Sequence, residues 1–181
     1  MSIIGIDLLN QAVNLHHYYK PDQIVAFLNE QLIKRLRKSE KEQVLKDSMD
    51  IAVCIFDRET YQLDYTGALI PIFIQSNGSL VEIKPDYITL GTSFGKEEKT
   101  FTINSFKMIE GDWVYLATDG YFDQLGGSQN KKYMRNQFKQ FVSQIHNLSG
   151  SEQRDLIEKE ILQWMGKNEQ IDDVLVWGVK I

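Results

Sequence analysis

The chain has 181 residues, of which 43% are hydrophobic and 25% charged, a mixture typical of a single globular domain. Its 20 lysines and arginines stand against 25 aspartates and glutamates, and the net charge of −5 argues against sequence-independent nucleic-acid binding and suits a site that holds cations. The single cysteine, Cys54, excludes an internal disulfide and a cysteine-rich zinc site, and its apolar surroundings at 51–56 predict a small buried hydrophobe.

No apolar run in the sequence approaches the ~20 residues that a membrane-spanning helix needs. The opening residues 1–3 also lack the basic stretch that begins a secretory signal peptide. We therefore expect a cytoplasmic chain without a membrane segment.

Two helices are predicted at the start of the chain. Apolar residues recur at a spacing of four over the first twenty residues, which is typical of an amphipathic helix. No capping residue precedes this helix, and we interpret it as the continuation of a segment upstream. A second helix is predicted to begin at Pro21-Asp22, and residues 34–46 are expected to form its solvated end and a loop.

From residue 48 the pattern becomes strand-like. Turns are predicted at residues 57–60 and at Asn77-Gly78, the latter a strong two-residue hairpin signal. The predicted strands cover residues 51–56, 61–65, 70–74, 80–83, 99–103 and 113–117. Consecutive hairpins imply antiparallel sheets, so we expect an α+β layered domain and not a doubly wound one.

Two helices and a strand are predicted at the end of the chain. They cover residues 132–145, 151–165 and 174–181, with Gly166 closing the second helix. Trp164 and Trp177 are predicted to be core residues.

Carboxylates stand at the ends of two predicted strands. Asp119 follows the apolar strand 113–117, and Asp172-Asp173 precedes the last strand. If these strands are antiparallel neighbours, Asp119 and Asp172 converge, and two close carboxylates repel each other unless a cation lies between them. Oxygen ligands without histidine or cysteine favour Mg²⁺ or Mn²⁺. The alternative is that Asp119-Gly120 is a turn and Asp172 a cap.

Other candidate sites are weaker. His16 and His17 are expected to be surface or partly packed residues, and His146 follows an amphipathic helix whose C-terminal dipole it suits. No acyl-transfer triad can be assembled from these three histidines. Residues 126–128 are glycine-rich but lack the lysine and the spacing of a phosphate-binding loop.

Two stretches carry a family resemblance. Residues 111–127 read Gly-Asp-Trp-Val-Tyr-Leu-Ala-Thr-Asp-Gly-Tyr-Phe-Asp-Gln-Leu-Gly-Gly, and residues 170–179 read Gln-Ile-Asp-Asp-Val-Leu-Val-Trp-Gly-Val. They resemble the metal-dependent protein phosphatases, most closely the SpoIIE-like branch of bacterial serine phosphatases. Weaker matches at residues 47–56, 65–68, 77–85 and 90–91 extend the resemblance over nearly all of the chain.

The resemblance implies a metal centre and a fold. By this resemblance Asp119 and Asp172 hold a dinuclear Mn²⁺ or Mg²⁺ centre that activates a bridging water. Asp123 matches a position linked to an additional, weaker metal, and Asp173 stands where the family has Asn or Asp beside the ligand. The implied fold is an α-β-β-α layered sandwich of two antiparallel sheets covered by helices.

One family motif has no counterpart in this sequence. The catalytic domain of the family begins with strands that carry an Asp-Gly-His-Gly-type motif, whose Asp bridges both metals. Here Asp-Gly occurs only at Asp119-Gly120, and residues 1–5 match the helix that follows the motif. We therefore expect residues 1–181 to form a single partial, N-terminally truncated phosphatase domain.

The resemblance also implies a function. It predicts a serine/threonine phosphatase acting on a phosphorylated partner protein, often an anti-sigma-factor antagonist, with a sensor or receiver domain upstream. Without the bridging ligand, this chain alone is expected to be weakly active or inactive, and unpaired sheet edges make a homodimer possible. Two alternatives remain: a non-catalytic phosphatase-like module that binds a signalling partner, and a domain in which these aspartates are purely structural.

Overall fold

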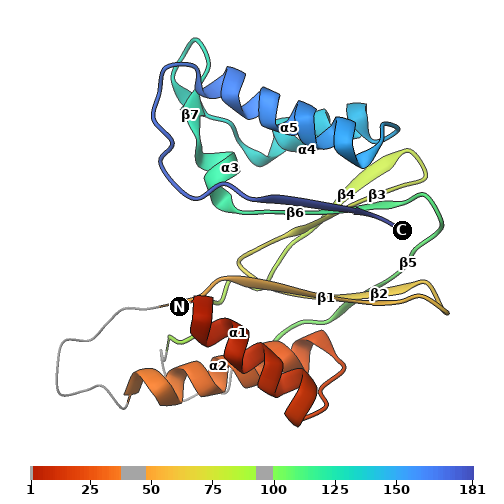
Figure 1. The fold of residues 1–181 in the computed structure, drawn as a ribbon, viewed down its shortest axis with the longest axis vertical. Coiled ribbons are helices and arrows are strands. Elements are labelled where there is room, and N and C mark those ends of the chain that lie inside the picture. The colour runs from red at the N-terminus through yellow and green to blue at the C-terminus, as the bar shows by residue number, and fades with distance from the viewer. Residues whose placement is uncertain (1, 38–47, 93–99) are drawn as a thin grey trace. The chain divides into compact units, whose positions relative to one another are not determined.

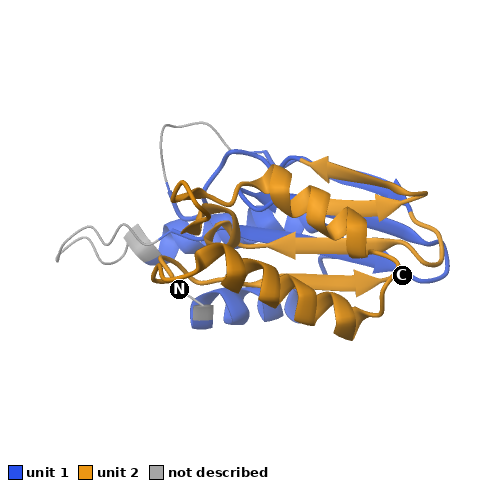
Figure 2. Cartoon of the chain, turned by 90° about the horizontal axis from the view of Figure 1, so that it is seen from above, with its two compact units in different colours: residues 1–71, 84–107 blue, residues 72–83, 108–181 orange. Residues whose placement is uncertain are grey.

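The computed structural model describes residues 2–37, 48–92 and 100–181 (Figure 1). Most of the charged loop expected within residues 34–46, and the first residue of the strand expected at 99–103, lie outside these ranges. The chain divides into two compact units (Figure 2). Unit 1 contains residues 1–71 and 84–107, and unit 2 contains residues 72–83 and 108–181.

Unit 1 contains a three-stranded antiparallel sheet in the order β1-β2-β5. Its strands are β1 (Ile51–Asp57), β2 (Gln62–Ala68) and β5 (Asn104–Lys107). The β1–β2 hairpin pairs Ile51 with Ala68 and Asp57 with Gln62, which confirms the turn expected at 57–60. Cys54 is partly buried in β1, where burial raises the pKa of its thiol to about 12.

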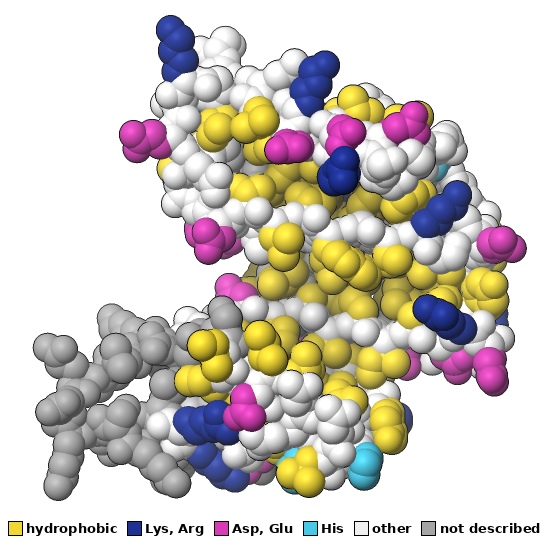
Figure 3. Space-filling model, in the orientation of Figure 1, with side chains coloured by type: hydrophobic (Ala, Val, Ile, Leu, Met, Phe, Trp, Pro, Cys, Tyr) yellow, Lys and Arg dark blue, Asp and Glu magenta, His cyan; other side chains and the backbone are white. Residues whose placement is uncertain are grey.

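The helices of unit 1 lie on one face of this sheet (Figure 1). They are α1 (Ser2–Asn10), the π-helical turn η1 (Gln11–Leu15) and α2 (Pro21–Arg37). Their inward faces form an aliphatic core with the sheet and with Leu90. Hydrophobic side chains remain at the surface of unit 1 (Figure 3). On α1, Ile3 and Ile6 are 85% and 62% exposed.

Unit 2 contains a four-stranded antiparallel sheet in the order β4-β3-β6-β9. Its strands are β3 (Ile72–Ser76), β4 (Ser79–Ile83), β6 (Trp113–Ala117) and β9 (Val176–Lys180). Asn77 and Gly78 join β3 to β4 with φ angles of 49° and 74°. Positive φ at both central residues is the signature of a type I′ turn, so the hairpin predicted from Asn-Gly is confirmed.

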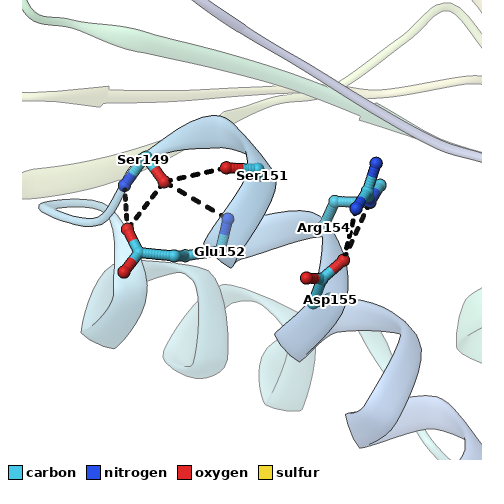
Figure 4. A network of polar contacts seen from close by, with 5 residues as sticks. All are labelled: Ser149, Ser151, Glu152, Arg154 and Asp155. Carbon is cyan, nitrogen blue, oxygen red and sulfur yellow. Dashed lines mark hydrogen bonds and ion pairs between the residues drawn. The ribbon is translucent and has the colours of Figure 1, made fainter.

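Helices and a small hairpin complete unit 2 (Figure 1). They are α3 (Asp119–Asp123), β7 (Leu125–Gly126), β8 (Lys131–Lys132), α4 (Arg135–Ile145) and α5 (Gly150–Met165). A capping box begins α5: the Ser149 hydroxyl accepts from the Glu152 backbone N–H, and the Glu152 carboxylate accepts from the Ser149 backbone N–H (Figure 4). Hydrogen bonds from the Ser149 side chain and backbone lower the pKa of Glu152.

Three local predictions are wrong. The strand expected at 99–103 lies instead at 104–107, because Asp86 binds the backbone N–H and the hydroxyl of Thr102 at 2.7 and 2.8 Å and holds this segment as a loop. The helix expected from Lys132 begins at Arg135, since Lys132 pairs with Leu125 in the small hairpin. Trp177 is 47% exposed, because it lies on the end strand β9.

Across residues 2–37, 48–92 and 100–181, no helix combines the length and the apolar character that crossing a bilayer requires.

Candidate metal centre

The end of β6 lies beside the start of β9. The two strands pair antiparallel up to Ala117 opposite Val176, so the neighbouring arrangement expected from the sequence is confirmed. Thr118 extends the contact: its backbone N–H donates to the Leu175 carbonyl at 3.0 Å, and its hydroxyl accepts from the Leu175 N–H at 2.9 Å. The same hydroxyl donates to the Asp173 carbonyl at 2.8 Å. Thr118 therefore joins the segment that carries Asp119 to the segment that carries Asp172 and Asp173.

Gly120 lets these two segments come into contact. A Cβ atom at this position would lie 2.4 Å from the carbonyl oxygen of Asp173 and 3.0 Å from its carbon. Since real Cβ contacts are longer, any other residue would push the backbone at Asp173 away. The glycine of the Asp-Gly pair is thus required by packing against the second acidic segment.

The carboxylates of the site differ in their partners. Asp119, Asp172 and Asp173 are exposed, and Asp172 accepts a hydrogen bond from the Asp173 backbone N–H at 2.7 Å. Asp123 lies at the other end of α3 and is partly buried. Its carboxylate forms an ion pair with Lys132 Nζ at 2.8 Å.

The donor set suits a hard divalent cation but does not complete a site. Carboxylate and backbone oxygens from α3 and from the segment before β9 are the ligands that Mg²⁺ and Mn²⁺ prefer. Within the described ranges, however, no three or more His, Cys, Asp or Glu side chains form a group able to hold a metal ion. These residues therefore suit Mg²⁺ or Mn²⁺ as the type of ion and would supply the ligands on one side of a centre.

Buried aromatic residues hold α3 in place. Tyr121 and Phe122 are buried, and the Tyr121 hydroxyl donates to the Ile157 carbonyl of α5 at 3.1 Å. Burial, reinforced by the negative charge of Glu160, raises the pKa of Tyr121 above its ordinary value of 10.0. Packing and a directional hydrogen bond thus fix the short helix that carries Asp119 and Asp123.

A separate groove of about 640 Å³ runs between α5 and the strands β6 and β9 of unit 2. Trp113 and Tyr115 on β6 and Ile157 on α5 are among its lining residues. Neither Asp119 nor Asp172 lines it, so this groove is distinct from the candidate metal centre.

The order of these features along the chain is that of a known family. The family model described as Stage II sporulation protein E (SpoIIE) matches residues 6–181. The chain belongs to the SpoIIE family. No curated protein sequence matches this SpoIIE-family chain significantly.

Solved structures share its fold. The SiaA-PP2C domain of Pseudomonas aeruginosa is 19% identical, with a TM-score of 0.87 over 99% of this chain and 68% of that one. A Bacillus subtilis SpoIIE structure with the PP2C phosphatase domain and a fragment of the regulatory domain is 17% identical, with a TM-score of 0.70 over 98% and 48%. The catalytic domain of the serine threonine protein phosphatase PstP, in complex with two manganese ions, is 14% identical, with a TM-score of 0.63 over 96% and 78%. The PP2C-type α+β fold expected from the sequence is confirmed.

Two residues of the site were not singled out from the sequence of this SpoIIE-family chain. Thr118 stands inside the Thr-Asp-Gly triplet, so its place before Asp119 was visible, although its bonds to the β9 segment were not. Lys132 gave no signal, because its ion pair with Asp123 depends on the small β7–β8 hairpin that the sequence pattern did not reveal.

Proposed function

We propose that this chain is part of a metal-dependent serine/threonine protein phosphatase in which Asp119 and Asp172 contribute ligands to a Mn²⁺ or Mg²⁺ centre. The observation that carries the proposal is the meeting of β6 and β9, which brings the Asp119-Gly120 segment against Asp172-Asp173. The two manganese ions in the PstP structure support the choice of metal. The reaction would be hydrolysis of phosphoserine or phosphothreonine on a partner protein by a metal-activated water.

The residues of this chain would either coordinate the metal ions or position the residues that do. Asp119 and Asp172 would supply carboxylate oxygens, with Asp173 beside them. Thr118 and Gly120 would fix the distance between the two acidic segments, through the hydroxyl bonds and through close packing. The remaining ligand would come from outside the described residues.

We extend the proposal to partners and setting. The substrate would be a small phosphorylated signalling protein of the anti-sigma-factor antagonist type. An upstream sensor or receiver domain would regulate the phosphatase in the cytoplasm. A homodimer is also expected, since β9 ends its sheet and has a strand partner on one side among the described residues. Light scattering at high protein concentration tests this expectation, and a strictly monomeric chain would contradict it.

A second candidate function is a phosphatase-like module that binds a partner without catalysis. The observation that favours it is the incomplete donor set of the described residues. Both candidates predict that the isolated chain hydrolyses phosphoserine peptides slowly or not at all. They differ in metal binding, which the first requires and the second does not.

Metal binding is therefore the decisive experiment. Mn²⁺ is titrated into the purified chain and into Asp119→Asn, Asp172→Asn and Asp155→Asn, the last removing an exposed carboxylate of α5 as a charge-matched control. We expect the first two substitutions to weaken Mn²⁺ binding and the control to leave it unchanged. Equal binding by all four proteins would refute the metal role of Asp119 and Asp172.

An activity assay separates the remaining possibilities. Robust Mn²⁺-dependent hydrolysis of a phosphoserine peptide, abolished by Asp119→Asn, would show that the chain is a competent enzyme and would overturn the expected low activity. Mn²⁺ binding that depends on Asp119, without hydrolysis, is the outcome expected for a phosphatase portion that lacks one ligand.

A further inference from the structure

Asp119 and Asp123 lie at the two ends of the single-turn helix α3. Residues four apart in a helix share a face, with Cβ atoms about 5–6 Å apart, so two carboxylates at this spacing repel each other. A cation near either carboxylate offsets this repulsion. The structure supplies one from the chain itself, because Lys132 Nζ lies 2.8 Å from Asp123 Oδ2.

The position of Lys132 is fixed by the backbone around it. Lys132 pairs with Leu125 in the β7–β8 hairpin. The next two residues return to the end of α3, where the Tyr133 N–H donates to the Gln124 carbonyl at 3.0 Å and the Met134 N–H to the Phe122 carbonyl at 2.8 Å. The ammonium group is thus presented to Asp123 by a hairpin that is bound to the same helix.

We propose that Lys132 is a built-in counter-ion of Asp123 and competes with divalent cations for this carboxylate. The inference rests on the proposed function in one respect, namely that the α3 carboxylates meet divalent cations. An ammonium group bound to Asp123 occupies a carboxylate oxygen that a metal ion would use, and its charge repels a nearby cation. A metal ion at Asp123 must therefore either displace Lys132 or bind the other carboxylate oxygen against the charge of the ammonium group.

The size of the competition follows from the exposure of the pair. Both side chains are about half exposed, and an ion pair of this kind contributes little free energy. Removing Lys132 should accordingly tighten cation binding at Asp123 by only about two- to five-fold.

The test compares two adjacent lysines. Lys131 and Lys132 carry equal charge, but successive side chains of a strand point to opposite sides, and Lys132 is the one paired with Asp123. Mn²⁺ alone is titrated into the intact chain, Lys132→Ala, Lys131→Ala, Asp123→Asn and the Asp123→Asn/Lys132→Ala double variant. Free Mn²⁺ is followed by its electron paramagnetic resonance signal. Should the circular dichroism spectrum of Lys132→Ala differ from that of the native chain, Lys132→Gln replaces it.

The expected result is tighter Mn²⁺ binding by Lys132→Ala than by Lys131→Ala, with no such gain when Asp123 is also replaced. Equal shifts for the two lysine variants would overturn the proposal, because the effect would then be one of general charge. A gain that survives Asp123→Asn would overturn it as well. So would the absence of Mn²⁺ binding in both the native chain and Lys132→Ala, since freeing the carboxylate would then create no cation site.

Failure of this inference can be told apart from failure of the proposed function. Mn²⁺ binding that depends on Asp119 and Asp172 but not on Lys132 would leave the proposed function intact and remove the competition. Binding that responds to Lys132 and Asp123 but not to Asp119 or Asp172 would do the reverse.

Discussion

The cores of the two units are built from different side chains. The buried cluster of unit 1 is aliphatic except for one phenylalanine: Leu8, Ala12, Ile24, Val25, Phe27, Leu28, Leu32, Ala68 and Leu90. In the buried cluster of unit 2 seven of ten residues are aromatic: Phe73, Trp113, Tyr115, Tyr121, Phe122, Tyr133 and Phe138. Since the aromatic cluster includes residues of α3, the difference bears directly on the candidate metal centre.

The aromatic core adds directional bonds to apolar packing. The Tyr115 hydroxyl donates to Gln153 Oε1 at 2.7 Å, and the Tyr133 hydroxyl donates to Glu160 Oε1 at 3.0 Å. In unit 1 a comparable buried polar group, Asn29, accepts from the backbone N–H of Gly91 and anchors a loop. Aliphatic packing is non-directional, whereas these bonds fix orientation. The comparison predicts that damage to the unit 2 core disturbs α3, whereas damage to the unit 1 core costs stability alone.

The largest expected effect comes from emptying each core in turn. Phe138 and Leu28 are both fully buried. The centroid of the Phe138 ring lies 5.3 Å from that of Tyr121 and 5.5 Å from that of Phe122. Phe138→Ala should lower the free energy of unfolding by about 3–5 kcal/mol and Leu28→Ala by about 2–5 kcal/mol. Urea denaturation followed by circular dichroism measures both. Mn²⁺ binding at a temperature where both variants are folded should weaken in Phe138→Ala only.

Equal loss of Mn²⁺ binding in the two core variants would contradict the comparison. It would mean that α3 depends on overall stability and not on its aromatic neighbours.

A smaller effect is expected where the two acidic segments touch. Gly120→Ala forces a Cβ atom against the Asp173 carbonyl, and overpacking of this kind costs about 1–3 kcal/mol. Gly150→Ala is the matched control in the same unit, because its Cβ atom would meet the Trp113 ring at 3.4 Å, an ordinary contact, at the start of α5. We expect thermal denaturation to show a loss for Gly120→Ala and no loss for Gly150→Ala. A Gly120→Ala protein as stable as the control would show that the segments can separate freely.

Much of the fold could be predicted from the sequence because its signals are local. The strand 113–117 and the Asn77-Gly78 turn were placed correctly, since an apolar run and a two-residue turn carry their own pattern. The strand expected at 99–103 was wrongly predicted. The segment does alternate apolar and polar residues, but Asp86, from another part of the chain, binds Thr102 and holds the segment as a loop. A side-chain bond between distant residues leaves no local trace.

The residues of the candidate site also fall into two groups, those that the sequence pattern indicates and those that only the fold reveals. Asp119 and Asp172 stand out by their positions at strand ends, and antiparallel neighbours bring such ends together. Their metal role stays a prediction. The Lys132 ion pair and the hydroxyl bonds of Thr118 depend on how α3, β8 and β9 are placed in three dimensions, so no spacing in the sequence could indicate them.

Alkaline pH should destabilise the two units to different extents. Burial raises the pKa of Tyr115, Tyr121 and Tyr133 in unit 2 above 10.0, and that of Cys54 in unit 1 from 9.0 to about 12. Because the folded state keeps these protons while the unfolded state loses them, stability is complete below the unfolded pKa values and falls as the pH rises above them. The three tyrosines together should make this fall in unit 2 up to about three times as steep as Cys54 alone makes it.

Each unit carries its own reporter for this measurement. All three tryptophans, Trp113, Trp164 and Trp177, lie in unit 2, so their fluorescence follows that unit during urea denaturation between pH 8 and 11. Alkylation of Cys54 follows unit 1 and should be slow at neutral pH, where its thiol stays protonated. If the stability of both units fell equally steeply with rising pH, the expected difference between them would be refuted.

The smallest expected effect concerns the start of α5, the helix that receives the tyrosine bonds of unit 2. Ser149→Ala removes the hydroxyl that accepts from the Glu152 backbone N–H, which should cost about 1 kcal/mol. Ser151→Ala removes a hydroxyl that lies 3.1 Å from Ser149 Oγ and leaves the capping box in place, so its loss of stability should be smaller. Because the pKa of Glu152 is lowered in the folded chain, its share of the capping stabilisation is present above 4.5 and is lost as the pH falls through the folded value. Thermal denaturation of both variants at pH 7 and at progressively lower pH should therefore show a gap that narrows with acid. A constant gap would mean that the Ser149 hydroxyl caps α5 without help from the Glu152 carboxylate.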